Sequence, residues 1–200
     1  ELDSGTTIDN STITLTLGAG QALTLDSITD GDTAAGAVSD GGITIAQAAS
    51  LTSLDLTLDD VGPATSITNE NIFIDIAGTG VTTANITTAN DSFIAFENSG
   101  AALTTINLNG SGTLGIIGTL ADSINTIDAA NSLANLTLTT GRGDDTIIAA
   151  SGNDFITLTG GTNNVTGGDG NNTINLSTGS DTVSTGSGSD IISASAGTNA

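Results

Sequence analysis

The order of apolar and polar residues along the chain predicts short β-strands rather than helices. In the first two thirds, aliphatic and polar residues alternate in several segments, and such alternation buries one face of a strand. The segments are residues 13–17, 23–25, 54–58, 72–76, 106–108 and 136–138. Turn signals that contain glycine, such as residues 78–80 and 109–110, separate many of them. Residues 45–51 could form a helical turn, but no long amphipathic helix is evident.

The last sixty residues follow a period of nine. A glycine recurs in each repeat, an Asp or Asn follows two residues later, and an aliphatic residue follows two residues after that. The glycines are Gly143, Gly152, Gly161, Gly170, Gly179, Gly188 and Gly197; the Asp or Asn residues are Asp145, Asp154, Asn163, Asn172, Asp181, Asp190 and Asn199; the aliphatic residues are Ile147, Ile156, Val165, Ile174, Val183 and Ile192. Because the spacing continues without an insertion, the nonapeptide is predicted to be the structural unit of residues 140–200.

This pattern resembles the glycine-rich nonapeptide of RTX proteins, G-G-x-G-x-D-x-U-x, in which U is aliphatic. The fourth and sixth positions match in all seven repeats, with Asp or Asn at the sixth, and the eighth matches in the six repeats that reach it. Residues 167–175 are the fullest copy, with Asn at the sixth position. The leading pair of glycines is degraded in the other copies. The resemblance covers roughly the last third of the chain, and its three fixed positions make it specific.

The resemblance implies an all-β fold, a right-handed parallel β-solenoid that ends in a β-roll whose 18-residue coil consists of two nonapeptides. Each aliphatic residue would point inward from a short strand, and residues 18 apart would stack at about 4.8 Å. The sixth-position side chains would then form two ladders, one of residues 145, 163, 181 and 199 and one of residues 154, 172 and 190. Residues 1–139 are expected to be a less regular β-rich region, continuous with the roll of residues 140–200. A separate β-sandwich over residues 1–100 is the alternative.

The resemblance also implies that Ca²⁺ binds between stacked turns, held by turn carbonyls and by sixth-position side chains of neighbouring coils. The implied ligands are Asp145, Asn163, Asp181, Asn199, Asp154, Asn172 and Asp190, with the turn glycines Gly143, Gly152, Gly161, Gly170, Gly179 and Gly188. Every stacked pair contains one Asp and one Asn. Calcium affinity falls with the charge of its ligands, so we expect weak sites, on the order of millimolar. We hypothesise that the roll is loose without calcium; a solenoid that has lost its calcium is the alternative.

The amino-acid composition further limits the partners and ligands that the chain can bind. The chain has 22 acidic residues and a single basic one, Arg142, which gives a formal net charge of −21. Nucleic acids and anionic membranes are bound through Lys and Arg, so neither is an expected partner. No apolar run approaches the roughly 20 residues of a membrane span. Cys, His and Lys are absent, which leaves the oxygen ligands that suit hard cations such as calcium.

No enzyme is expected within this chain, because paired carboxylates without aromatic platforms or basic clamps make a poor sugar site. The four phenylalanines, Phe73, Phe93, Phe96 and Phe155, lie in apolar strands and are expected in the core.

The predicted function is structural: a calcium-binding segment of a bacterial surface layer, sheath or filament that self-assembles outside the cell. The segments between Leu103 and Leu138 are similar in style to the coils that precede nonapeptide arrays in bacterial S-layer and other large secreted surface proteins. The resemblance implies export by a one-step, type I system. Further copies of the chain are the expected partners, and a cell-surface polysaccharide is a second candidate. The alternative is an RTX module of a giant adhesin, or of a secreted enzyme whose active domain lies elsewhere.

Overall fold

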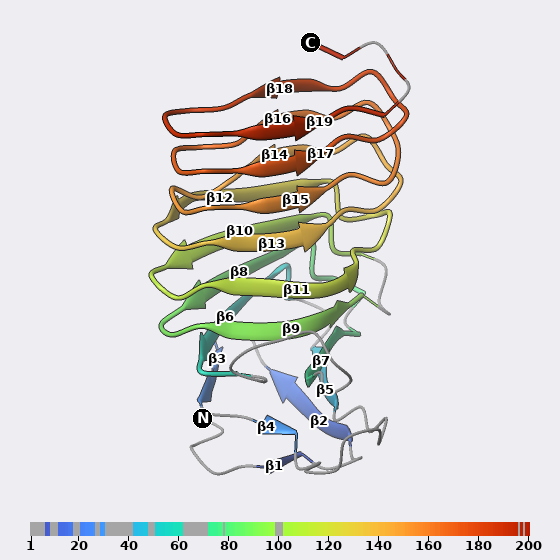
Figure 1. Ribbon diagram of the computed structural model, residues 1–200. Coiled ribbons are helices and arrows are strands. Elements are labelled where there is room, and N and C mark those ends of the chain that lie inside the picture. The colour runs from blue at the N-terminus through green and yellow to red at the C-terminus, as the bar shows by residue number, and fades with distance from the viewer. Residues whose placement is uncertain are drawn as a thin grey trace.

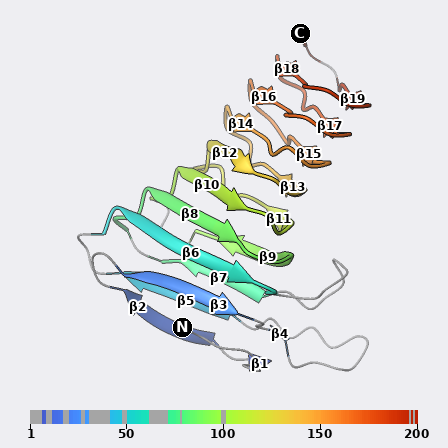
Figure 2. The same ribbon diagram turned by 90° about the vertical axis from the view of Figure 1, so that its left-hand side faces the viewer.

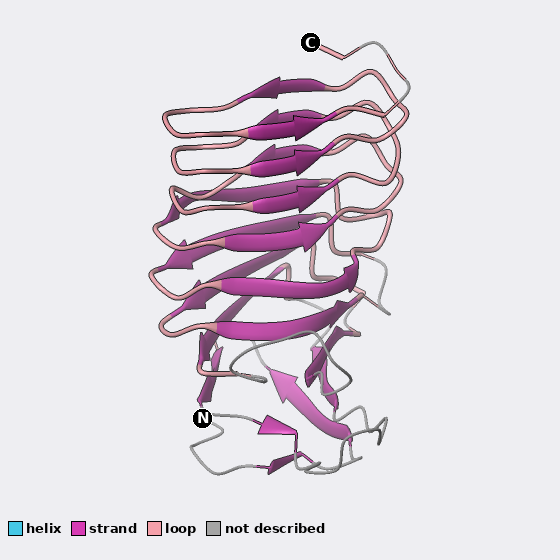
Figure 3. Ribbon diagram, in the orientation of Figure 1, coloured by secondary structure: helices cyan, strands magenta, loops and turns pink. Residues whose placement is uncertain are grey.

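The computed structural model describes residues 7–8, 12–17, 21–26, 29–30, 42–47, 51–61, 72–77, 79–98, 102–195, 197 and 199–200. These residues form β-strands joined by turns, without a helix (Figure 3). A helix that could cross a membrane is accordingly not found in the described part of the chain. The all-β prediction is confirmed.

Two large parallel sheets face each other along the stack (Figures 1 and 2). In spatial order, the eight-stranded sheet contains β18 (Thr182–Ser184), β16 (Asn164–Thr166), β14 (Thr146–Ile148), β12 (Thr126–Ser132), β10 (Thr105–Gly110), β8 (Thr83–Thr88), β6 (Ser53–Asp59) and β3 (Ala22–Asp26). The nine-stranded sheet contains β19 (Ile191–Ser193), β17 (Thr173–Asn175), β15 (Phe155–Thr157), β13 (Leu136–Thr139), β11 (Leu114–Thr119), β9 (Ser92–Glu97), β7 (Ile72–Ile76), β5 (Gly42–Gln47) and β2 (Thr12–Leu17). The short strands β1 (Thr7–Ile8) and β4 (Thr29–Asp30) pair with each other.

Successive strands alternate between the two large sheets, so one coil of the chain contributes one strand to each. Every strand pair in the described residues is parallel, and each inner strand of the two large sheets bonds to the strand one coil before and the strand one coil after it. This is the predicted β-solenoid. Apart from β4, the strands between residues 12 and 97 lie in the same sheets that continue into the roll, so these described strands do not form the separate β-sandwich that was the alternative for residues 1–100.

The coils become shorter toward the carboxyl end. In the nine-stranded sheet, Gly42 pairs with Phe73. Ser92 pairs with Leu114, so that a shorter stretch of chain completes the coil. From β13 onward each strand residue pairs with the residue two nonapeptides later, as Thr137 does with Phe155. The 18-residue coil predicted from the nonapeptide is confirmed, and the stack narrows toward it (Figure 2).

The space between the sheets is filled by one continuous core of aliphatic side chains. All six alternating segments predicted as strands lie in strands, and in β6 the inward residues Leu54, Leu56 and Leu58 are fully buried. In the roll, Ile147, Ile156, Val165 and Ile174 are buried as predicted. Val183 is half-buried and Ile192 is 47% exposed, because β18 and β19 are the outermost strands of their sheets.

Two local predictions were wrong. The helical turn proposed for residues 45–51 is wrong over residues 45–47, which are the end of β5, because Ile43 and Ile45 alternate into the core. Residues 48–50 lie outside the described residues. Phe155 is not a core residue: it is 46% exposed, since Ile156 takes the inward position of β15. Of the other phenylalanines, Phe96 is buried, whereas the remaining two are half-buried.

Candidate metal sites in the turns

The two predicted ladders of sixth-position side chains exist and are largely buried. Each of these residues except Asn199 lies immediately before a strand of the roll, at the end of a glycine-containing turn. The buried ones point into that turn rather than to solvent. The buried members are Asp145, Asn163 and Asp181 in one ladder and Asp154 and Asn172 in the other; Asp190 and Asn199, near the end of the stack, are half-buried. The fold therefore places charged or polar groups where the desolvation of a charge is costly unless it is compensated.

Each ladder is held together by hydrogen bonds from backbone to side chain. The side-chain Oδ1 of one residue accepts the backbone N–H of the sixth-position residue one coil earlier. The pairs are Asp145 N–H to Asn163 (2.9 Å), Asn163 N–H to Asp181 (3.0 Å), Asp181 N–H to Asn199 (3.0 Å), Asp154 N–H to Asn172 (2.9 Å) and Asn172 N–H to Asp190 (3.0 Å). The structure thus brings together every pair that the sequence placed in a common ladder.

The fourth-position glycines allow these turns to stack. At Gly170 the backbone has a φ of +92°, and a Cβ there would collide with the carbonyl oxygen of Gly152 in the preceding coil. At Gly179 the φ is not in this left-handed range, but a Cβ would still collide with the Gly161 carbonyl. Close approach of one turn to the next is therefore the shared reason for glycine, with the left-handed conformation added at some positions.

Sequence reasoning missed a second set of turn contacts, made by the fifth-position residues. Here the side chain accepts the N–H of the residue one coil later, the opposite direction to the sixth-position ladders. The pairs are Asp144 with Thr162 N–H, Asn153 with Asn171 N–H and Asn171 with Ser189 N–H, all at 2.7 Å. The signal was the recurrence of Asn at residues 135, 153 and 171, which are 18 apart.

Two buried carboxylates in the ladders have oxygen atoms without a hydrogen-bond donor. Asp145 is 1% exposed, and neither of its carboxylate oxygens accepts a hydrogen bond of normal geometry. Asp154 is 2% exposed; its Oδ1 accepts the Leu136 N–H at 2.7 Å, but its Oδ2 has no partner. Buried polar atoms without a partner are uncommon in proteins and point to a missing ligand or ion.

Desolvation is the main reason why the pKa values of these two carboxyl groups are raised. Burial raises the pKa of Asp145 to about 6, and the nearby Thr140 hydroxyl lowers it only in part. Burial likewise raises the pKa of Asp154 to about 6, against the lowering effect of the backbone N–H groups of Leu136 and Ala150. A carboxylate with a raised pKa is one whose charge is poorly compensated by the protein alone.

A calcium ion fits what these turns lack. It would be held at one turn by Asp145 with turn carbonyls and the Asn163 Oδ1, and at the other by Asp154 with turn carbonyls and the Asn172 Oδ1. Calcium takes six to eight oxygen ligands, and carbonyls serve as well as carboxylates. Carbonyls are needed here, because no group of three or more acidic side chains converges on one point within the described ranges. When bound, the ion supplies positive charge to a buried carboxylate.

The raised pKa values predict how the calcium-free fold depends on pH. A carboxyl group with a pKa of about 6 in the fold and 3.8 in the unfolded chain stabilises the fold below pH 4, and this contribution is lost as the pH rises through 6. In a chelator, raising the pH from 4 to 7 should therefore remove about 1–3 kcal/mol of stability for each group. The pKa of the exposed Asp169 is lowered by the N–H and hydroxyl of Ser187, which acts in the opposite direction.

Urea unfolding at both pH values, with the chelator present, measures this loss. The D145N/D154N variant is the control, because it removes both groups and should show a much smaller loss between pH 4 and 7. Equal losses in the variant and the unsubstituted chain would contradict the assignment.

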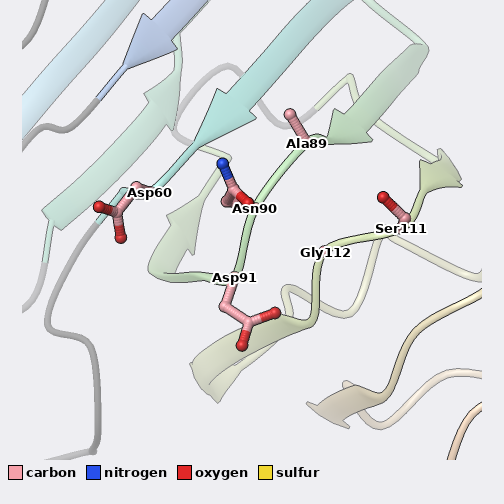
Figure 4. Close-up of a pocket in the computed structure, with 6 residues that line it drawn as sticks. All are labelled: Asp60, Ala89, Asn90, Asp91, Ser111 and Gly112. Carbon is pink, nitrogen blue, oxygen red and sulfur yellow. The ribbon is translucent and has the colours of Figure 1, made fainter.

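Another acidic turn, in the wider coils, does not have this character. A pocket there is lined by Asp60, Ala89, Asn90, Asp91, Ser111 and Gly112 (Figure 4). Asp60 and Asp91 are exposed, and their carboxylates point away from each other (Figure 4). The Asp91 Oδ1 already accepts the Thr113 N–H at 2.7 Å. Both carboxylates are exposed to solvent, so neither is a buried charge without compensation, as Asp145 is.

Comparison with known proteins agrees with this location. The model of the RTX calcium-binding nonapeptide repeat (4 copies) matches residues 137–165, 158–192 and 166–199. The matched region starts in β13, includes Asp145 and Asp154, and covers the 18-residue coils. No curated protein and no solved structure matches the chain significantly.

Proposed function

We propose that the chain is a structural segment of an extracellular bacterial assembly whose copies associate in calcium. The premise is the RTX-type calcium-binding β-roll that the described part of residues 137–199 forms. The observation that carries the proposal is the continuous stack of two parallel sheets from β2 to β19. Each coil bonds to the next through its backbone, which suits a rod or a wall element. The same stack leads without a break into the turns that bind calcium.

The outer face of the eight-stranded sheet supports a structural role. Small polar side chains occupy matching places in successive coils, in a column of Ser53, Thr83, Thr105, Thr126, Thr146, Asn164 and Thr182. Beside this column, Asn85 Nδ2 donates to Asp55 at 2.7 Å and Asn107 Nδ2 donates to Asn85 at 2.8 Å. Such a face is regular along the stack and is reinforced from coil to coil, as a packing surface between copies requires.

Charge supports a role for calcium in the association. A net charge of −21 makes copies of the chain repel one another. Exposed carboxylates, among them Asp60, Asp91, Asp122 and Asp144, are available for bridging by a divalent cation. RTX repeats are characteristic of proteins exported by type I systems, and weak calcium sites function where calcium is millimolar, outside the cell. An extracellular location therefore fits both the repeats and the charge.

Electron microscopy and light scattering of the purified 200-residue chain test this proposal. Samples would contain calcium, magnesium at the same ionic strength, or a chelator. We expect ordered sheets or filaments in calcium and dispersed chains in the other two conditions.

Dispersed chains in all three conditions would overturn the assembly. They would favour instead an RTX module that supports the secretion and folding of an adhesin or enzyme domain elsewhere. Assembly that is equally strong in magnesium would show that charge screening, rather than calcium, brings the copies together.

A further inference from the structure

The side-chain amide of Asn163 lies among oxygen atoms of its turn that could otherwise bind a cation. Its Nδ2 donates to the carbonyl of Gly160 at 3.0 Å and to Asp181 Oδ1 at 2.8 Å, and it lies 3.3 Å from Ser177 Oγ. These contacts are a carbonyl, a carboxylate and a hydroxyl, the kinds of oxygen that bind calcium. In this turn the N–H groups of the Asn163 amide donate to these oxygens, in place of a cation.

The orientation of this amide is fixed by its neighbour. Asn163 Oδ1 accepts the backbone N–H of Asp145, which can only donate. The nitrogen must then face the other way, toward the oxygens of the turn. The same holds for Asn172: its Oδ1 accepts the Asp154 N–H, and its Nδ2 faces the carbonyls of Gly168 (3.4 Å) and Asp169 (3.3 Å).

Asp181 shows the effect of this arrangement on the next carboxylate in the ladder. Its Oδ1 accepts both the backbone N–H and the Nδ2 of Asn163, and its Oδ2 lies 3.4 Å from the Ser177 hydroxyl. Although Asp181 is fully buried, it has no oxygen without a partner. The Asn amide and a hydroxyl therefore satisfy this carboxylate without a metal.

Asp145 and Asp154 lack such a donor. Asn125 is the residue one coil before Asp145, because Thr126 pairs with Thr146. The Asn125 N–H donates to the Thr104 carbonyl in the wider coils. It therefore does not donate to the Asp145 carboxylate, as the corresponding N–H groups do later in the ladder. Asp154 receives the Leu136 N–H, but no side-chain amide donates to its Oδ2. These are the first sixth-position residues of their two ladders.

We propose that Asn163 and Asn172 replace calcium in their own turns with their side-chain amides, so that the roll takes calcium at two turns only, those of Asp145 and Asp154. This inference rests on the calcium binding proposed for the roll. The alternation of Asp and Asn then separates two kinds of turn. The turns of Asp145 and Asp154, at the start of the roll, need an ion, and the turns of Asn163 and Asn172 stack without one. The metal is then needed where the 18-residue coils join the wider ones.

The number of ions can be read from thermal unfolding. When calcium binds only the folded chain and its sites are near saturation, stability rises with the logarithm of calcium concentration in proportion to the number of sites. Calorimetry over a range of calcium concentrations at constant ionic strength gives this slope. The variants are N163D, which replaces the amide with a carboxylate, and N164D, which adds the same charge at the adjacent, outward-facing and exposed Asn164.

We expect N163D to increase the slope 1.5-fold over the unsubstituted chain, from two sites to three, and to lower the melting temperature in chelator. N164D should leave the slope unchanged, and D145N/D154N should remove it. If N163D leaves the slope unchanged, or if N164D raises it equally, the replacement of calcium by the amide is wrong although calcium still binds. If the unsubstituted chain has no slope, the roll does not bind calcium, and the proposed function fails with it.

Discussion

Adding about 10 mM calcium to the calcium-free protein is expected to raise the melting temperature of the roll by on the order of 10 °C. With weak sites, on the order of 1 mM, each of two ions stabilises the folded chain by about 1.4 kcal/mol at this concentration. For a unit of about 60 residues, each kcal/mol corresponds to roughly 4–8 °C. Differential scanning calorimetry in calcium and in chelator measures the shift.

The control for this effect is the D145N/D154N variant in the same two buffers. It removes the two buried carboxylates that lack partners, so its melting temperature should not respond to calcium beyond the response to an equal ionic strength of magnesium. A variant that is stabilised by calcium as strongly as the unsubstituted chain would show that the ions bind elsewhere, for example at the exposed carboxylates.

The second large effect is expected from the core of the roll. Ile156 is fully buried between Leu138 and Ile174 in the inward column of the nine-stranded sheet. Replacing it with alanine removes three carbons and leaves a cavity, at a cost of about 2–5 kcal/mol. Since each coil of the roll contributes few aliphatic side chains, little else can compensate. Urea unfolding in calcium measures the loss.

Phe155 provides the matched control, because it is the neighbouring residue on the opposite face of β15. Phe155 is 46% exposed and lies on the outer face, where Phe93 and Ile117 line the same pocket. The F155A substitution should cost about 1 kcal/mol or less, as surface changes usually do. A larger loss for F155A than for I156A would reverse the inward and outward assignment of this strand.

The period of nine carried most of the information about the roll. It predicted the 18-residue coil, the inward aliphatic residues and the two ladders, because a strict repeat allows the geometry of one unit to be applied to all. Alternation alone was sufficient for strands such as β6, in which Leu54, Leu56 and Leu58 are buried. It was not sufficient to show how these strands pair, since the longer steps of the first coils, such as that from Gly42 to Phe73, correspond to no repeat in the sequence.

What the sequence could not reveal depends on contacts between coils. Asp145 and Asp181 occupy the same position of the repeat, yet only Asp145 lacks partners. The difference arises from Asn163, whose amide reaches Asp181, and from Asn125, whose N–H is used by the wider coils. Such differences follow from the neighbouring coil and not from the repeat itself. The exposure of Phe155 was missed for a simpler reason: its apolar character was weighed above its place in the alternation.

Amide hydrogen exchange with and without calcium tests the central claim most directly, because it locates the effect along the chain. We predict that calcium slows exchange in the turns and strands of residues 137–183, most strongly around Asp145 and Asp154. Exchange in the wider coils of residues 83–110 should change little, and magnesium should not reproduce the pattern. An absence of protection in the roll, or equal protection along the whole chain, would contradict the account of a calcium-binding roll.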